Sequence, residues 1–139
     1  MAAKDIFHDL VKEALINEGW SITHDPYKIV LGRRRGYIDP GAEREIMAAQ
    51  KNNEKIAIEI KSFVSNSDLD AFEDALGQFL IYWKALKAND AERTLYLALP
   101  LGFYNRFFDD AFFLDVARSF DVKMIVFHET EPKIEKWTK

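Results

Sequence analysis

The chain has 139 residues, and its 19 basic and 23 acidic side chains give a formal net charge of −4. This length fits one domain over residues 1–139, and a hydrophobic content of 48% with 14% aromatics excludes a disordered chain. The chain has no cysteine, which excludes disulfides and thiolate metal sites and fits a cytoplasmic protein, and no apolar run is long enough to cross a membrane.

The first part of the chain predicts a helix followed by extended structure. Apolar residues recur at i, i+3 and i+4 over residues 4–19, and Gly19 supplies the C-terminal stop. A strand begins at Trp20 and is interrupted at Asp25–Pro26. Residues 27–31 are apolar and β-branched enough to form a further strand or to continue the first one.

A hairpin and a second helix are expected next. Residues 43–50 and 55–63 read as two antiparallel strands joined by a turn at Asn52–Asn53. If the hairpin is regular, Glu59 lies opposite Ile46. A helix is then expected over residues 68–88, with an N-cap at Ser67.

The remaining elements complete an α/β domain. Two nearly continuous apolar segments predict strands buried on both faces, one of them closed by Pro100, with a helix between them and a short edge strand at the end. The two strands cover residues 94–99 and 122–127, the helix between them covers residues 108–119, and the edge strand covers residues 134–137. The order αβββαβαβ describes a mixed central sheet flanked by helices.

The strand over residues 55–63 carries Glu59 and Lys61, and both side chains project from the same face. Charged residues are rarely tolerated on a central strand unless they are paired or line a cleft. An upstream acid followed by a strand with Glu-x-Lys is the pattern of the PD-(D/E)xK nuclease site. There two carboxylates hold a divalent metal, and the lysine positions or activates water.

Two residues compete for the role of the upstream carboxylate. Asp39 lies several residues beyond the end of the regular hairpin and needs a bend at Pro40–Gly41, whereas Glu43 needs less distortion. Mg²⁺ binds oxygen ligands and keeps several waters, so two carboxylates and one carbonyl suffice. We therefore expect Mg²⁺ or Mn²⁺ on Glu59, the carbonyl of Ile60 and either Asp39 or Glu43, with Lys61 as a point charge beside water and phosphate.

Other polar residues have weaker signals. Glu13 lies one turn from the end of the first helix, where it is a solvated face position or reaches the metal from the side. Gln78 borders the apolar stripe of the second helix and either bonds a backbone group or faces the cleft. The basic loop of Arg33, Arg34 and Arg35 is solvated or contacts phosphate. A dense aromatic group over residues 103–113 is mostly core, and any exposed part of it predicts a protein interface.

Taken together, several segments resemble the XisH proteins over essentially the whole chain. The matching segments are Met1–His8, Asp39 with Ala42–Glu43, Ile56–Phe63, Ala75–Phe79, Leu95–Ala98 and Ile134–Trp137. The resemblance implies a restriction-endonuclease-like αβββαβ core and control of the excision of a DNA element. It also implies Asp39, Glu59 and Lys61 as the nuclease-like triad, with Glu13 and Gln78 in supporting roles. The chain departs from the expected pattern at Pro40 and Gln50.

The resemblance also implies partners, and it leaves two functions open. The expected partners are DNA, bound weakly by the chain alone, a small XisI-like companion protein and a site-specific recombinase; self-association is also expected. An intact acid and Glu-x-Lys favour a metal-dependent DNA endonuclease. The negative net charge favours an inactive nuclease fold that regulates excision by binding a partner, because neutralising phosphates supplies most non-specific DNA affinity. A third possibility, a nuclease that its companion protein holds inactive, is consistent with both the intact site and the negative charge.

Overall fold

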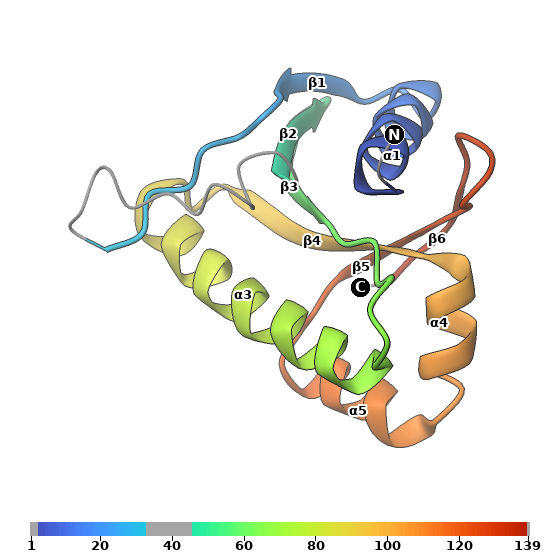
Figure 1. Cartoon of the computed structure of the whole chain (residues 1–139). Coiled ribbons are helices and arrows are strands. Elements are labelled where there is room, and N and C mark those ends of the chain that lie inside the picture. Colours follow the sequence, from blue (N-terminus) through green and yellow to red (C-terminus); the bar gives the residue numbers. More distant parts are fainter. Residues whose placement is uncertain (1–2, 33–45, 139) are drawn as a thin grey trace.

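The strands form a mixed sheet in which neighbours in the chain are also neighbours in space (Figure 1). A computed structural model describes residues 3–32 and 46–138. Within this part of the chain the sheet contains β1 (Ser21–His24), β2 (Ile46–Lys51), β3 (Glu54–Ile60), β4 (Arg93–Pro100), β5 (Met124–Phe127) and β6 (Ile134–Trp137). The β3–β4 and β4–β5 pairs are parallel, and the other neighbouring pairs are antiparallel.

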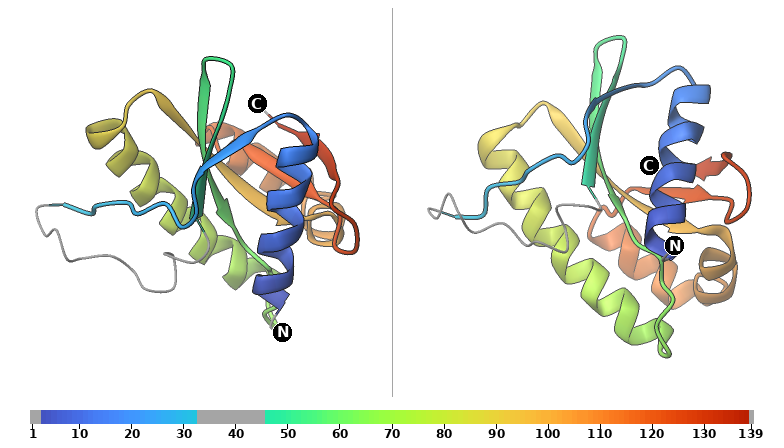
Figure 2. Two further views of the ribbon diagram at one scale, coloured as in Figure 1. Left: turned by 90° about the horizontal axis from the view of Figure 1, so that it is seen from above. Right: turned by 45° about the horizontal axis from the view of Figure 1, so that its top comes forward.

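Helices cover both faces of the sheet (Figures 1 and 2). They are α1 (Ala3–Asn17), α3 (Asp68–Asn89), α4 (Leu101–Phe107) and α5 (Ala111–Ser119). One hydrophobic core lies between the sheet and α3, α4 and α5, and the other lies between the sheet and α1. Alternate residues of β3 and β4 enter opposite cores, so these two strands are buried on both faces as their apolar sequences predict.

The structure confirms the predicted fold class and the expected order of the core elements. β3 lies in the interior of the sheet between β2 and β4, and Glu59 pairs with Ile46 as the hairpin register predicts. Gly19 ends the first helix region with a φ of +95°, and the Ser67 hydroxyl accepts a hydrogen bond from the backbone N–H of Asp70. None of the helices within residues 3–32 and 46–138 has the length and apolarity needed to cross a membrane.

The structure differs from the sequence predictions in two details. Residues 27–31 form no strand, because Tyr27 and Ile29 are held by side-chain contacts with the α3 side of the molecule. The phenol of Tyr27 donates a hydrogen bond to Asp90 at 2.7 Å. The helix expected over residues 108–119 is α5, which begins after Asp110, whose carboxylate accepts a hydrogen bond from the N–H of Phe112. The sequence did not predict α4, which precedes that range.

The aromatic group over residues 103–113 is mostly core, as predicted. The rings of Phe103, Phe107 and Phe108 are buried and contact one another, whereas Phe112 remains 66% exposed. These rings fill the space between α3, α4 and α5. They therefore fix the α3 layer against the sheet face that carries Ala57 and Glu59.

Candidate functional site

Glu59 is the only polar or charged residue in the described part of the chain whose side chain is fully buried. It lies near the end of β3, between Ile46 of β2 and Leu97 of β4. The flanking Ile58 and Ile60 enter the core on the α1 side, so strand alternation turns Glu59 toward the α3 side. Burying an ionised carboxylate is costly unless a cation or donor compensates it, so its placement here requires a specific reason.

Lys61 follows directly after β3. Its backbone N–H donates to the carbonyl of Ala98 at 3.0 Å, so the pairing with β4 continues one residue past the strand. The side chain is half-buried and lines a pocket of about 590 Å³ between the loop after β3 and α3. Lys61 therefore reaches a surface that a substrate can approach, while Glu59 does not line this pocket.

Gln78 lies on the α3 wall of the same pocket. Its side-chain oxygen is buried and has no hydrogen-bond partner among the described residues. A buried amide oxygen without a partner costs stability, which is typical of a residue kept for a ligand or a neighbouring group. The structure thus places Lys61 and Gln78 on one pocket.

The other predicted site residues lie elsewhere or outside the described residues. Glu13 is exposed on α1, which covers the opposite face of the sheet, and it does not line the pocket of Lys61 and Gln78. Asp39, its competitor Glu43 and the basic loop Arg33–Arg35 lie outside the described residues.

The donors near the end of β3 fit part of a divalent cation site. The carboxylate of Glu59 and the carbonyl of Ile60 are hard oxygen donors, and Mg²⁺ can be held by as few as one or two carboxylates with water completing its shell. Among the described residues no group of three or more His, Cys, Asp or Glu side chains converges on one point. The expected second carboxylate, Asp39, lies outside the described residues.

Phe63 is a residue of this region that the sequence analysis did not single out. Its φ of +53° lies in the left-handed region, which is unfavourable for a side chain of this size. Its ring stacks on Phe103 with a centroid distance of 3.9 Å and an interplanar angle of 18°. This contact holds the backbone immediately after Lys61 against α4.

Acidic groups also border the pocket. Asp70 and Asp74 line it from the first turns of α3. Nearby, the guanidinium of Arg106 on α4 binds both carboxylate oxygens of Asp68 at 2.7 and 3.0 Å. The hydrogen bond from Arg106 holds the pKa of Asp68 below its usual range, so this pair ties the start of α3 to α4. The carboxylates of Asp70 and Asp74 oppose a bare phosphate, which makes a neutralising cation a requirement for DNA in this pocket.

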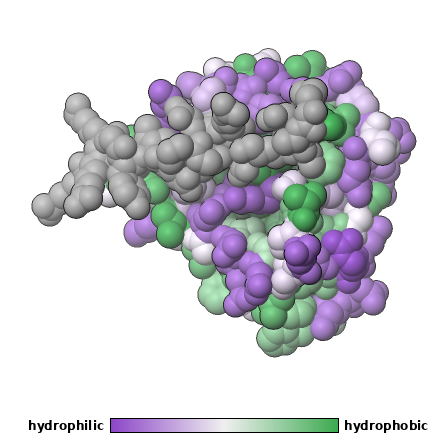
Figure 3. Space-filling view, in the orientation of Figure 1, coloured by the Kyte–Doolittle hydropathy of each residue, from purple (hydrophilic) through white to green (hydrophobic). Residues whose placement is uncertain are grey.

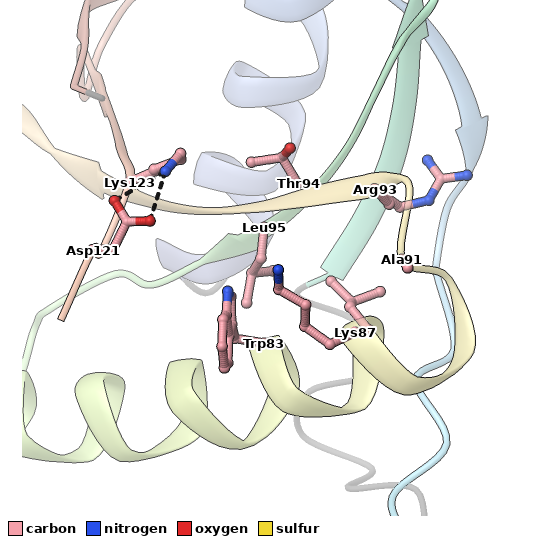
Figure 4. A pocket seen from close by; sticks show the side chains of 9 residues that line it. Trp83, Lys87, Ala91, Arg93, Thr94, Leu95, Asp121 and Lys123 are labelled. Atoms are coloured by element: carbon pink, nitrogen blue, oxygen red, sulfur yellow. Dashed lines mark hydrogen bonds and ion pairs between the residues drawn. The ribbon is translucent and has the colours of Figure 1, made fainter.

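A second pocket, of about 150 Å³, lies at the other end of α3 (Figure 4). Lys123 is bound there by both carboxylate oxygens of Asp121 at 3.0 Å. Arg93 donates to Asp90 and to the carbonyl of Ile56. Both of these cations are therefore paired with neighbouring carboxylates.

The sequence model of the XisH protein family matches residues 1–135. The chain belongs to the XisH family. Two solved structures support this assignment. A crystal structure of an XisH family protein from Nostoc punctiforme PCC 73102 is 39% identical, with a TM-score of 0.86 over 97% of this chain and 100% of that chain. A crystal structure of an fdxN element excision controlling factor protein from Anabaena variabilis is 38% identical, with a TM-score of 0.86 over 97% of this chain and 99% of that chain.

Comparison with curated proteins gave no match. The XisH assignment therefore comes from the family model and from these crystal structures, which agree with the resemblance found in the sequence.

Proposed function

We propose that this XisH chain is an excision controlling factor with a PD-(D/E)xK nuclease-type site, and that it assists the excision of a DNA element by metal-dependent cleavage of a phosphodiester bond. The observation that carries the proposal is the fully buried Glu59 on a central strand, followed two residues later by Lys61 at the edge of a pocket. A carboxylate and an ammonium at the end of a buried central strand are costly for stability, which favours a functional role for them.

Each residue has a distinct role in the proposed reaction. Glu59 and Asp39, with the carbonyl of Ile60, would hold Mg²⁺ or Mn²⁺. The bound ion would neutralise charge on the phosphate and lower the pKa of water. The ammonium of Lys61 would hold the attacking water and a phosphate oxygen, and the amide of Gln78 would fix the water or the lysine from the α3 wall.

A second function is favoured by the net charge of −4. In this alternative the nuclease fold is inactive, and the chain regulates excision by binding an XisI-like companion or a recombinase. The charge disfavours DNA binding by the chain alone, since phosphate neutralisation supplies most non-specific affinity. A chain that binds the companion or the recombinase but does not cleave DNA would fit this regulatory function and not the nuclease function.

A plasmid assay tests the proposal. Supercoiled DNA is incubated with the chain and Mg²⁺ or Mn²⁺, with and without a co-expressed companion, and nicked and linear products are measured. Wild type should produce them and Lys61→Ala should not. Lys55→Ala is the matched control, because Lys55 lies at the opposite end of β3 and pairs with the exposed Glu92 at 3.4 Å. Equal cleavage by wild type and Lys61→Ala, or none in any condition, would favour the regulatory function.

DNA affinity gives a second measurement. At about 150 mM salt we expect weak binding of labelled duplex DNA by the chain alone, and weaker binding still when Arg33, Arg34 and Arg35 are replaced by alanine. Tight binding under these conditions would instead indicate a nuclease that needs no partner.

A further inference from the structure

The outer face of α3 carries an ordered pattern of exposed residues. The inner face of this helix is buried through Phe72, Ala75, Phe79, Tyr82 and Leu86. The opposite face exposes Asp70, Glu73, Asp74, Gly77, Ile81, Lys84 and Lys87. In the orientation of Figure 1, this side of the molecule is mainly hydrophilic with isolated hydrophobic positions (Figure 3).

The middle of this face is small and apolar. A Cβ added to Gly77 would meet nothing within 4 Å, so nothing in the described part of the chain requires a glycine there. Glycine inside a helix is destabilising relative to alanine, which leaves its presence unexplained by the isolated chain. Ile81, one turn later, is 57% exposed. A glycine beside an exposed isoleucine permits close approach of another helix and offers it an apolar contact.

The charges on either side of this centre have opposite signs. Asp70, Glu73 and Asp74 lie in the N-terminal half of the face, and Lys84 and Lys87 lie in the C-terminal half. The helix dipole favours acids in the first turn and bases in the last turn. It does not account for Glu73, Asp74 and Lys84, because the effect falls off within one turn of each end. The Asp70–Asp74 spacing also places like charges one turn apart, which is unfavourable in an isolated helix.

We propose that two copies of the chain associate through these outer faces, with the two α3 helices antiparallel about a twofold axis near Gly77 and Ile81. In this arrangement the acidic half of each helix lies opposite the basic half of its partner, so Glu73 and Asp74 of one copy meet Lys84 of the other. Such an interface is self-complementary, as twofold symmetry requires. The proposal concerns self-association, and the proposed interface borders the candidate pocket at the end of β3, because Asp70 and Asp74 also line that pocket.

The contact is small and partly electrostatic. One pair of helices is below the size of a standard stable interface, so we expect a weak dimer with a dissociation constant between about 10 µM and 1 mM. Because the ion pairs are at the surface, association should weaken as salt increases.

Sedimentation equilibrium across this concentration range tests the proposal with charge-reversal variants. Lys84→Glu and Glu73→Lys should each raise the dissociation constant at least about tenfold, and the double variant carrying both changes in one chain should restore association. Lys133→Glu makes the same change of charge in the turn between β5 and β6 and should associate as wild type does. A strictly monomeric wild type, or a dimer that neither charge reversal weakens, would overturn the proposal.

A substitution at Gly77 separates folding from association. Gly77→Gln should raise the melting temperature of the chain, because glutamine favours a helix and its Cβ meets no atom. The same variant should weaken association, because its side chain occupies the space where the helices approach. A raised melting temperature with unchanged association would show that the face is only solvated, and would also overturn the proposal.

Discussion

Replacing Glu59 by glutamine tests whether the buried carboxylate serves function at the expense of stability. The change keeps the shape of a side chain that is fully buried and removes only its charge. In EDTA, the free energies of unfolding of wild type and Glu59→Gln give the effect of this charge on stability without divalent metal. For a chain of this size each kcal/mol raises the melting temperature by roughly 4 °C.

Divalent metal should stabilise wild type and leave the stability of Glu59→Gln unchanged. If Mg²⁺ binds at Glu59 with a dissociation constant of about 1 mM, about 10 mM Mg²⁺ stabilises wild type by RT ln 11, or about 1.4 kcal/mol. That corresponds to a shift of roughly 5 °C, which Glu59→Gln should lack. Thermal unfolding followed by circular dichroism in EDTA and in Mg²⁺ measures both effects.

Glu54→Gln is the matched control for this experiment. Glu54 begins the same strand but is exposed, so its variant should retain the stability and the Mg²⁺ response of wild type. A Glu59→Gln protein that Mg²⁺ stabilises as much as wild type would refute the reasoning. Glu59 would then be a member of a structural ion pair, and the proposed metal site would be wrong.

Three further outcomes are expected. Lys61→Ala should abolish cleavage while changing the free energy of unfolding by less than about 1 kcal/mol in urea titrations, and loss of folding would identify Lys61 as a structural ion-pair partner. Asp90 accepts hydrogen bonds from Arg93 at 2.9 Å and Tyr27 at 2.7 Å, which hold its pKa below the usual range. Because the pKa of Asp90 is lower in the folded chain, its carboxylate stabilises the fold above about pH 4, and this stabilisation is lost as the pH falls through the folded pKa. Asp90→Asn should therefore lower the free energy of unfolding by about 1 kcal/mol at pH 7 and by less at pH 3. An equal loss at both pH values would contradict the stabilising role of the Asp90 carboxylate. Burial, followed by the bond to Asp90, raises the pKa of Tyr27 to about 12, so ultraviolet titration should show this phenol ionising at lower pH in Asp90→Asn than in wild type.

The sheet could be predicted because its signals are local. Apolar residues on both faces predicted that β3 and β4 are interior strands, and the turn at Asn52 fixed the β2–β3 register. Asn52 has a φ of +56°, a conformation that asparagine tolerates better than most residues. Hydrophobic period and turn chemistry were therefore sufficient for this part of the fold.

Elements that depend on distant contacts were not predictable in the same way. The segment over residues 27–31 has β-branched residues, yet it forms no strand. The N–H of Tyr27 donates to the carbonyl of Ile46 at the start of β2, while the phenol of Tyr27 donates to Asp90 and the side chain of Ile29 is buried. α4 follows β4 directly, and its sequence is rich in aromatics rather than in strong helix formers. It is stabilised by the burial of Phe103 and Phe107, four residues apart on one face.

The residues of the candidate site also differ in whether local sequence signals or distant contacts determine their positions. Glu59 and Lys61 could be identified from sequence, because a charged pair interrupts an apolar strand. The contribution of Phe63 could not, since it depends on a left-handed backbone and a ring stacked on a residue forty positions later. The choice between Asp39 and Glu43 likewise depends on where the chain bends, which spacing alone does not determine.

The order of the strands in the sheet has a consequence for how the chain acquires its structure. Each described strand from β2 to β6 pairs with the described strand that precedes it in the sequence, so none of these pairings has to wait for a segment from the opposite end of the chain. The parallel pairs β3–β4 and β4–β5 each close across an intervening helical connection, so we expect them to form more slowly than the β2–β3 hairpin. As the chain leaves the ribosome, each new strand finds its neighbour already present, and an unpaired edge is exposed only until the next strand is made.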